Sequence, residues 1–518
     1  MKDGQNTAHW IIAVGLTLAV IMDAFNGTVF TISRPQIMGS LRVTADEASW
    51  ANLAYLIAKA AGLPTAAWIV DRFGERRSLF WSVTIIVAGS LLCTLAIGMP
   101  LFVGARIFHG AAGAVLLVAA QTILLRLFPP ASQALVQALY AVGVMMAPTT
   151  FAPAVQGWLT DSFSWNWVFW LNAGLTPVVL LCLLPYRKRL PNTVQLRRPF
   201  DGFGFCLFLL AMAALIYVLL EGSRWNWFDD DRITLFSGIG IGAGIVFVVW
   251  RVIDARARLI ERTIFSNTQF TFGFTVSFVA GFVLSGSAFL IPAFALGVLA
   301  LPAMDTGLLL LPSSAAVGAG LLIAGALITW KKINPLLFTP LGIVLVMTAM
   351  WMLSGSSSES GAQDLWPSLL VRGLGLGFLF ISITVFTLTR LDADHIASGV
   401  GLFNFGRQMG GVIGISFLST YLDHQTALNR RVLIKNIDLT NLSFQQYQET
   451  LSTALTVRGL NPELAMQGAL AVIQKHIMIQ AAVLSFNEAF FSLVLLFLVA
   501  APLVMAFKGV QKLFGRRR

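Results

Sequence analysis

The sequence predicts an all-α protein that crosses a membrane many times. Of its 518 residues, 57% are hydrophobic and 11% are charged, whereas about 25% of the residues of a soluble domain are charged. The apolar residues form long runs that short polar segments separate. A run of about 20 such residues spans a hydrocarbon layer of about 30 Å. These observations exclude the class of soluble enzymes.

Apolar windows of about 20 residues predict fourteen transmembrane helices. The first six lie near residues 10–32, 50–70, 79–98, 101–122, 134–157 and 167–186. Two more lie near 202–221 and 233–252, and the last six near 270–293, 305–328, 336–354, 367–388, 398–421 and 485–507. We therefore expect a six-helix bundle in 1–186, a two-helix insertion with cytoplasmic linkers in 187–267 and a second six-helix bundle in 268–518.

Basic residues set the expected orientation in the membrane. Most of the 35 Lys and Arg residues fall in segments on the same side as the N-terminus, such as Arg187, Lys188 and Arg189. Short loops rich in Lys and Arg stay cytoplasmic. An even number of spans places both ends of the chain on one side, so both termini are expected in the cytoplasm.

The sequence lacks the patterns of several other kinds of site. The net charge of +11 comes from short basic clusters and not from one patch, which argues against nucleic acid as a partner. The three cysteines lie in apolar runs and the five histidines are scattered, so neither disulfides nor a metal site is indicated. No phosphate-binding loop occurs. We expect no cofactor, no metal and no catalytic residues.

The two predicted six-helix groups look like repeats of each other. Span 4 has Arg106 near its start and ends at Arg126, and span 12 has Arg372 near its start and ends at Arg390. Internal repeats are typical of membrane transporters, whose substrate site lies near the midplane between the repeats. The repeat therefore predicts a transporter working in the lipid bilayer.

The segment 422–485 is too polar for a span. Its second part begins with Asn461, Pro462 and Glu463, a helix start with a cap, a proline in the first turn and an early acid. A continuous helix from Pro462 into the last span would rise about 35 Å above the membrane at 1.5 Å per residue. We predict a helical hairpin on the periplasmic side, with a partly ordered loop as the alternative.

Charged residues inside the spans are the candidate functional residues, because each costs a few kcal/mol in hydrocarbon and therefore faces a polar cavity. Asp23 lies in the middle of span 1, and a buried carboxylate suits proton coupling unless it is paired. The alternative is a static ion pair with Arg106 or Lys59. Lys59 either pairs with Asp23 or binds an anionic group of the substrate, and Arg372 and Arg407 are further candidates for the substrate cavity.

The turn after span 2 suggests a family. Residues 71–77 read DRFGERR, which resembles the D-R-x-G-R-[KR] loop of the major facilitator superfamily. That resemblance implies a conformational gate on the cytoplasmic face, made of Asp71, Arg72, Gly74 and Arg76. An ordinary basic cytoplasmic turn is the alternative, and Glu75 departs from the family pattern.

Span 4 contains a second motif of this superfamily. Residues 106–110 read RIFHG, which resembles R-x-x-Q-G with His109 in place of Gln. His109 is either a proton carrier or a neutral hydrogen-bonding substitute for that Gln. With Asp23 and Arg106 it completes the predicted proton-coupling set.

Three further stretches resemble the fourteen-span EmrB/QacA-type drug:proton antiporters. Residues 152–172 read APAVQGWLTDSFSWNWVFWLN, similar to that group's antiporter motif, so Pro148, Pro153 and Gly157 are expected to bend span 5. Residues 407–414 read RQMGGVIG, which adds Gln408 to the cavity candidates. The third is span 1, where the group often has a Glu twelve and an Asp nine residues before the closing proline. This chain has Asp23 and Asn26 at these two positions, so Asn26 is a further candidate for the substrate cavity.

The resemblance implies proton-coupled export of amphipathic drugs or toxic organic compounds by alternating access, which confers antibiotic resistance. It places the chain in the bacterial inner membrane and implies, as partners, a small amphipathic substrate, a periplasmic membrane-fusion adaptor and an outer-membrane channel. One alternative is a dedicated exporter of a single acidic metabolite such as a siderophore or a fatty or aromatic acid. Another is a membrane sensor that does not transport.

Overall fold

The chain is helical throughout the part that the structure describes. This structure, a computed structural model, describes residues 2–194, 199–253, 260–435 and 442–515. The first helices are α1 (Lys2–Leu41), α2 (Ala45–Phe73), α3 (Glu75–Thr94), α4 (Met99–Leu127), α5 (Gln133–Ala141), α6 (Ala152–Ser162) and α7 (Asn166–Leu183). They are followed by α8 (Gly202–Glu221), α9 (Asp231–Ile253), α10 (Arg262–Ser266), α11 (Thr268–Gly297), α12 (Ala303–Trp330), α13 (Phe338–Leu353), α14 (Ala362–Leu388), α15 (Ile396–Lys435), α16 (Leu442–Val457) and α17 (Pro462–Gly515).

Local sequence fixes where α2 begins and ends. Thr44 and Glu47 form a capping box at its start, in which each side chain accepts a hydrogen bond from the other residue's backbone N–H, and this satisfies two donors that the first turn leaves free. Gly74 ends α2 with a φ of +83°. A side chain there would also meet Asn192, so glycine is required at this turn.

Twelve of the helices in the described residues are long and apolar enough to cross a membrane, and the bent pair Gln133–Thr149 and Ala152–Ser162 would make thirteen. The chain is therefore a multi-pass membrane protein. The long helix α15 is not among them, since Asn404, Arg407 and Gln408 make its sequence polar. The count of fourteen spans thus stays a prediction.

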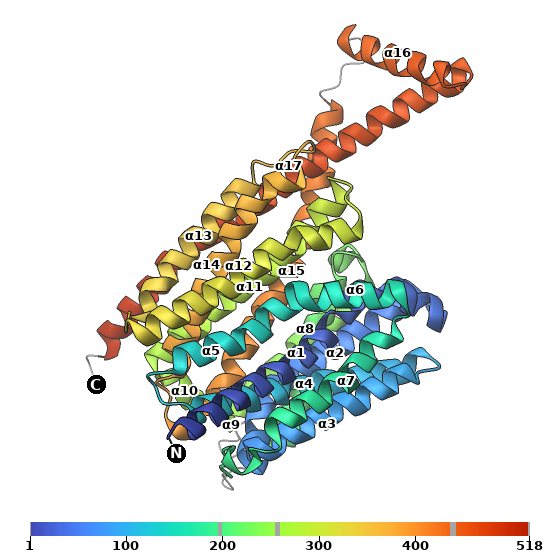
Figure 1. Ribbon diagram of the computed structural model, residues 1–518. Coiled ribbons are helices and arrows are strands. Elements are labelled where there is room, and N and C mark those ends of the chain that lie inside the picture. Colours follow the sequence, from blue (N-terminus) through green and yellow to red (C-terminus); the bar gives the residue numbers. More distant parts are fainter. Residues whose placement is uncertain (1, 195–198, 254–259, 436–441, 516–518) are drawn as a thin grey trace.

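The membrane helices pack in two groups (Figure 1). In the first group, α4 packs on α2 and α3, and α1 packs on α6 and α7. In the second, α11 packs on α15, and α14 packs on α12 and α13. Helices α8 and α9 pack on each other, and α8 also contacts both α2 and α15. The pair α8 and α9 therefore lies where the two groups meet.

Both labelled chain ends lie at one end of the helices, and α16 lies beyond the opposite end (Figure 1). We call these the terminal end and the hairpin end. At the hairpin end, α15 extends to Lys435, and α17 runs without a break from Pro462 toward the terminal end. The continuous helix predicted from Pro462 is thus present, with α16 packed against it.

Candidate functional site

A buried ion pair lies inside the first group of helices. Asp23 on α1 is 3% exposed, and its Oδ2 accepts a hydrogen bond of 2.6 Å from the Nζ of Lys59 on α2. The hydroxyl of Tyr55 donates to the other carboxylate oxygen over 3.2 Å and accepts from Lys59 over 2.9 Å. Both oxygens of the carboxylate therefore have partners, as a buried charge requires.

Two glycines of α4 make room for this pair. A Cβ at Gly113 would overlap the carboxylate of Asp23, and a Cβ at Gly110 would overlap the backbone of α2 at Tyr55. Because neither glycine carries a side chain, α4 approaches both α1 and α2 closely. The position of the ion pair thus depends on the small residues of a third helix.

Arg106 lies beside the pair, and among the described residues it forms no ion pair. Its side chain is fully buried, its Nη1 donates to the carbonyl of Asn26 over 2.8 Å and its Nε donates to the carbonyl of Ala51 over 3.4 Å. Its guanidinium lies 4.4 Å from the centre of the Tyr55 ring. Carbonyl oxygens and an aromatic face thus compensate the charge of Arg106. Of the two bases that the sequence left open as ion-pair partners of Asp23, the structure pairs Lys59 with it.

His109 belongs to a separate polar network. Its Nε2 lies 3.1 Å from both the hydroxyl of Ser90 and the carbonyl of Ile86. Asn172 on α7 donates to Ser90 and to the side-chain oxygen of Asn26, over 2.9 Å in each case. Asn172 therefore links Asn26 on α1 to Ser90 on α3, and Ser90 in turn contacts His109 on α4.

A third network crosses between the two helix groups. Asn404 on α15 donates to Gln121 on α4 over 2.9 Å, and Gln121 donates to Gln137 on α5 over 3.0 Å. Arg407 donates to the side-chain oxygen of Asn404 over 2.5 Å, and Gln408 beside it is half-buried. This predicted cavity residue, Arg407, thus lies at the boundary of the groups.

Arg372 lies within the second group. Its guanidinium donates to the hydroxyl of Ser287 on α11 over 2.8 and 2.9 Å and to that of Ser313 on α12 over 3.0 Å. The structure therefore does not bring all the predicted residues together. Asp23, Lys59 and Arg106 form one cluster, whereas Arg372 joins three helices of the other group.

The predicted gate loop lies at the terminal end and contains an ion pair that the sequence did not indicate. Glu75 is buried and pairs with Arg126 at the end of α4, and it also accepts from the backbone of Thr193 over 2.8 Å. Arg126 also donates over 3.0 Å to the carbonyl of Ala393 in the other group. Glu75, which departs from the family pattern, thus forms an ion pair with Arg126, the residue that bonds to the second group.

The other gate candidates surround this pair. Asp71 and Arg76 are half-buried and Arg72 is exposed, and Arg76 donates to the carbonyl of Arg187 over 3.4 Å. Gly74 makes the sharp turn between α2 and α3. Their gating role stays a prediction, and all four lie within four residues of Glu75 in the sequence.

The candidate bend of span 5 coincides with an irregular segment. Residues Val142–Phe151 form a π-helix that contains Pro148, Pro153 follows in the first turn of α6, and Gly157 lies one turn further on. The two parts of this span differ in direction by 43°. Such a bend is expected where proline removes a backbone donor.

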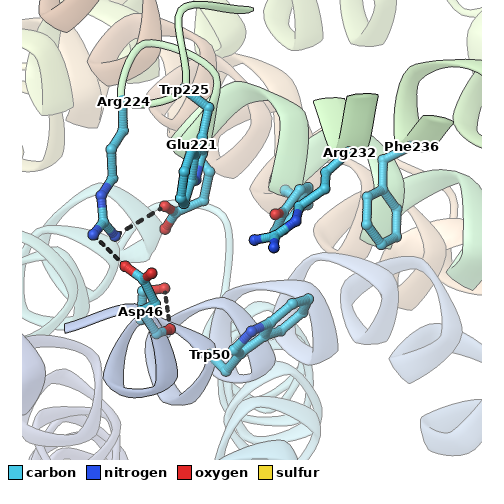
Figure 2. A pocket seen from close by; sticks show the side chains of 9 residues that line it. Asp46, Trp50, Glu221, Arg224, Trp225, Arg232 and Phe236 are labelled. Carbon is cyan, nitrogen blue, oxygen red and sulfur yellow. Dashed lines mark hydrogen bonds and ion pairs between the residues drawn. The ribbon is translucent and has the colours of Figure 1, made fainter. Parts of the chain in front are cut away.

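At the hairpin end, the α8–α9 turn links the two groups. Arg224 pairs with Asp46 at the start of α2 and with Glu221, as Figure 2 shows, and Ser223 donates to Asp423 on α15. The ion pairs of Arg224 border a pocket of about 250 Å³ that Trp50 and Trp225 also line. The insertion therefore contacts both groups at this end.

Comparisons with known proteins establish the family. A family model described as the Major Facilitator Superfamily matches residues 16–415. The chain belongs to the Major Facilitator Superfamily. The family and fold that the motifs indicated are thereby confirmed, and this member of the superfamily is a membrane transporter and not an enzyme.

Relatives of this transporter include drug exporters. The chain is 26% identical to "Multidrug export protein EmrB" of Haemophilus influenzae, over 90% of this chain and 91% of the relative. It is also 26% identical to "Fatty acid resistance protein FarB" of Neisseria gonorrhoeae, over 95% of each chain. The fold resembles the crystal structure of the human organic anion transporter MFSD10, with a TM-score of 0.56, 11% identity and coverage of 95% of this chain and 99% of that one.

Breaking the Asp23–Lys59 pair should destabilise the protein. In Asp23→Asn, the buried ammonium of Lys59 loses its counter-charge, and we expect a loss of about 3 kcal/mol in the free energy of unfolding. The double variant Asp23→Asn/Lys59→Met removes both charges and should lose less than the two single variants summed. Unfolding of the purified protein by SDS measures these energies, and strictly additive losses would contradict the pairing.

Proposed function

We propose that this transporter exports amphipathic drugs or other toxic organic compounds in exchange for protons, by alternating access of its two helix groups. The observation that carries the proposal is the ion pair of Asp23 and Lys59, buried between α1 and α2. Relatives named multidrug export proteins, similar over almost the whole length, support the direction of transport.

Protonation of Asp23 changes the charge of the site. With Asp23 ionised, the pair is neutral overall. A proton on Asp23 leaves the buried ammonium of Lys59 without its carboxylate partner. The hydroxyl of Tyr55, 2.9 Å away, then remains as an uncharged partner. A buried charge without a counter-charge is strongly unfavourable. The proton therefore favours a different arrangement of the helices, which is the condition for coupling. Arg106 and His109 would tune this step from the neighbouring positions.

This scheme also restricts the substrate. An anionic group bound to Lys59 would favour protonation of Asp23, so anion and proton would move together. Exchange requires a substrate that competes with the proton. The pair therefore favours neutral or cationic amphipathic compounds, and Asn26 beside it supplies an uncharged polar contact.

A second candidate function is export of one acidic metabolite. The observation in its favour is that Arg372 and Arg407 are charged groups in the helix interior whose contacts are hydroxyl, amide and aromatic groups. A carboxylate could bind there, away from Asp23. The similarity to the relative named for fatty acid resistance supports this second candidate function.

The terminal end is proposed to be the cytoplasmic end in the bacterial inner membrane. Exposed basic residues gather there, among them Arg72, Arg77, Arg187 and Lys331, as the positive-inside rule requires. Direct hydrogen bonds between the groups occur toward this end, from Arg126 and from Leu135. The proposed gate, with Asp71, Arg72, Gly74 and Arg76, would thus be closed here. The division into six, two and six spans belongs to the same proposal.

The hairpin end is proposed to bind a periplasmic membrane-fusion adaptor that leads to an outer-membrane channel. Helix α16 and the first part of α17 extend beyond the other helices (Figure 1). A groove of about 590 Å³ lies between them, lined by side chains that include Phe444, Met466 and Leu470. Gln445, Gln448 and Glu449 also line this groove. A groove that combines apolar and polar side chains suits an amphipathic helix of a partner.

Replacing the carboxylate should abolish exchange. In inverted vesicles, Asp23→Asn should lower proton-driven transport of a cationic dye about tenfold or more, because no group remains to exchange the proton. Glu359→Gln, which removes an exposed acid from the loop between α13 and α14, is the control and should transport normally. Full proton-driven transport by Asp23→Asn would overturn the assignment.

The same assay separates the two candidate functions. An anionic amphiphile is tested beside the dye, with Arg407→Gln as the variant. Transport of the anion alone, lowered by Arg407→Gln, would establish the second candidate.

Removing the cross-group contact should loosen the terminal end. Arg126→Gln removes the ion-pair partner of Glu75 and weakens the hydrogen bond to Ala393. Spin labels are attached at Pro130→Cys and Asp392→Cys in a background without native cysteines. In the Arg126→Gln variant, the distance between the two labels should be longer and its distribution broader. We expect a shift of about 1.5–3 kcal/mol in the equilibrium, the value of a hydrogen bond that involves a charged group. Lys331→Gln at the same end is the control, and equal distances in both variants would disprove the gating contact.

Photocrosslinkers test the adaptor. Placed at Gln445, Gln448 and Gln480, they should trap one periplasmic protein in intact cells, while the same group at Leu181, on the far side of the molecule, should not. Capture at none of the three sites would remove the adaptor from the proposal.

A further inference from the structure

A lateral groove of about 620 Å³ opens on the side of the first helix group, between α2, α3, α4 and α8. Its walls are apolar, with Trp68, Ile85, Phe108 and Leu209 among them. The side chains of Trp81, Ile85 and Phe108 are between 41% and 54% exposed, so the groove is open toward the surrounding membrane. A Cβ at Gly62 would lie 2.9 Å from Ala114, and this close contact of α2 with α4 closes its floor.

The groove extends over one leaflet of the bilayer. On α2 it runs from Ala58 to Phe73, the last residue of the helix at the terminal end. At 1.5 Å per residue this is about 22 Å, or half of a bilayer of about 40–45 Å including its headgroups. The groove therefore begins near the midplane and ends at the headgroups.

Positive charge flanks the end of the groove at the membrane surface. Arg77 precedes Trp81 by four residues on α3, and Arg72 follows Trp68 by four residues on α2, so each lies one turn beyond a lining residue on the same face. Both arginines are exposed. The rings of Phe73 and Trp81, 5.1 Å apart, join α2 and α3 between them.

We propose that this groove binds one acyl chain of an anionic phospholipid from the leaflet at the terminal end, with Arg72 and Arg77 holding its headgroup phosphate. The apolar walls match a hydrocarbon chain, the length matches a single leaflet, and the charge at the mouth matches a phosphate. A membrane-spanning helix of another protein needs about 30 Å of contact, which is longer than this groove. The inference does not depend on what is transported.

Native mass spectrometry of the purified transporter tests the site. The wild-type protein should retain one phospholipid after mild detergent extraction. Ala111→Trp places a large side chain in the groove at an exposed position, and it should lose that lipid. Leu181→Trp on α7, at a side chain that is 74% exposed, is the matched control and should retain it.

The charge at the mouth is tested separately. Arg77→Gln should keep a lipid but lower its preference for phosphatidylglycerol over phosphatidylethanolamine about fivefold, the effect of one basic residue near a membrane surface. Lys331→Gln, which removes an exposed charge at the same end, should leave the preference unchanged. Equal preferences in the two variants would overturn the role of the arginine.

A measurement on the otherwise unaltered chain guards against misfolded variants. A photocrosslinking amino acid at Ile85, a half-exposed groove residue, should attach to phospholipid in native membranes. Attachment to a protein, or to a transported compound in place of lipid, would disprove the proposal. So would a wild-type protein that retains no phospholipid, or equal retention by Ala111→Trp and Leu181→Trp.

Discussion

Asp23 and Lys59 can remain charged inside the first helix group only as a pair, and much of the surrounding packing follows from this constraint. The carboxylate needs two donors, which Lys59 and Tyr55 provide from positions four residues apart on one face of α2. It also needs space, which Gly113 provides on α4. Because Asp23 pairs with Lys59, the guanidinium of Arg106 contacts carbonyl oxygens and the Tyr55 ring. One buried acid thus specifies residues on three helices.

The contact between α2 and α4 has two faces with different properties. On the inner face, Gly110 and Gly113 bring α4 against the backbone of α2 and the carboxylate of Asp23. On the outer face, Gly62 closes the floor of the apolar groove. Because the same backbones form both surfaces, a movement of α4 against α2 would alter the groove and the ion pair together. The lipid site is therefore placed to sense the state of the transporter.

The sequence predicts the charged part of the site better than its uncharged part. A charge inside an apolar run stands out because its burial is costly, so Asp23, Lys59 and Arg106 could be found without coordinates, although which base pairs with Asp23 could not. The network of Gln121, Gln137 and Asn404 could not be predicted in this way. Single uncharged amides are common in apolar helices, so these residues do not stand out in the sequence. Glu75 and Arg126 lie at helix ends, where charges are ordinary, and only the fold brings them together.

Hydrogen bonds between the two helix groups contribute to the free energy needed to move one group relative to the other. Among the described residues they include the hydrogen bonds of Arg126 and Leu135 at the terminal end, and the Asn404–Gln121 and Thr149–Ser314 bonds further inside. Each contributes about 0.5–3 kcal/mol, in addition to the packing of α15 on α2 and of α12 on α5. A proton that removes the counter-charge of Lys59 changes the energy by a similar amount. The proposed protonation of Asp23 would therefore change the energy by an amount comparable to that of these hydrogen bonds, although none of them involves Asp23.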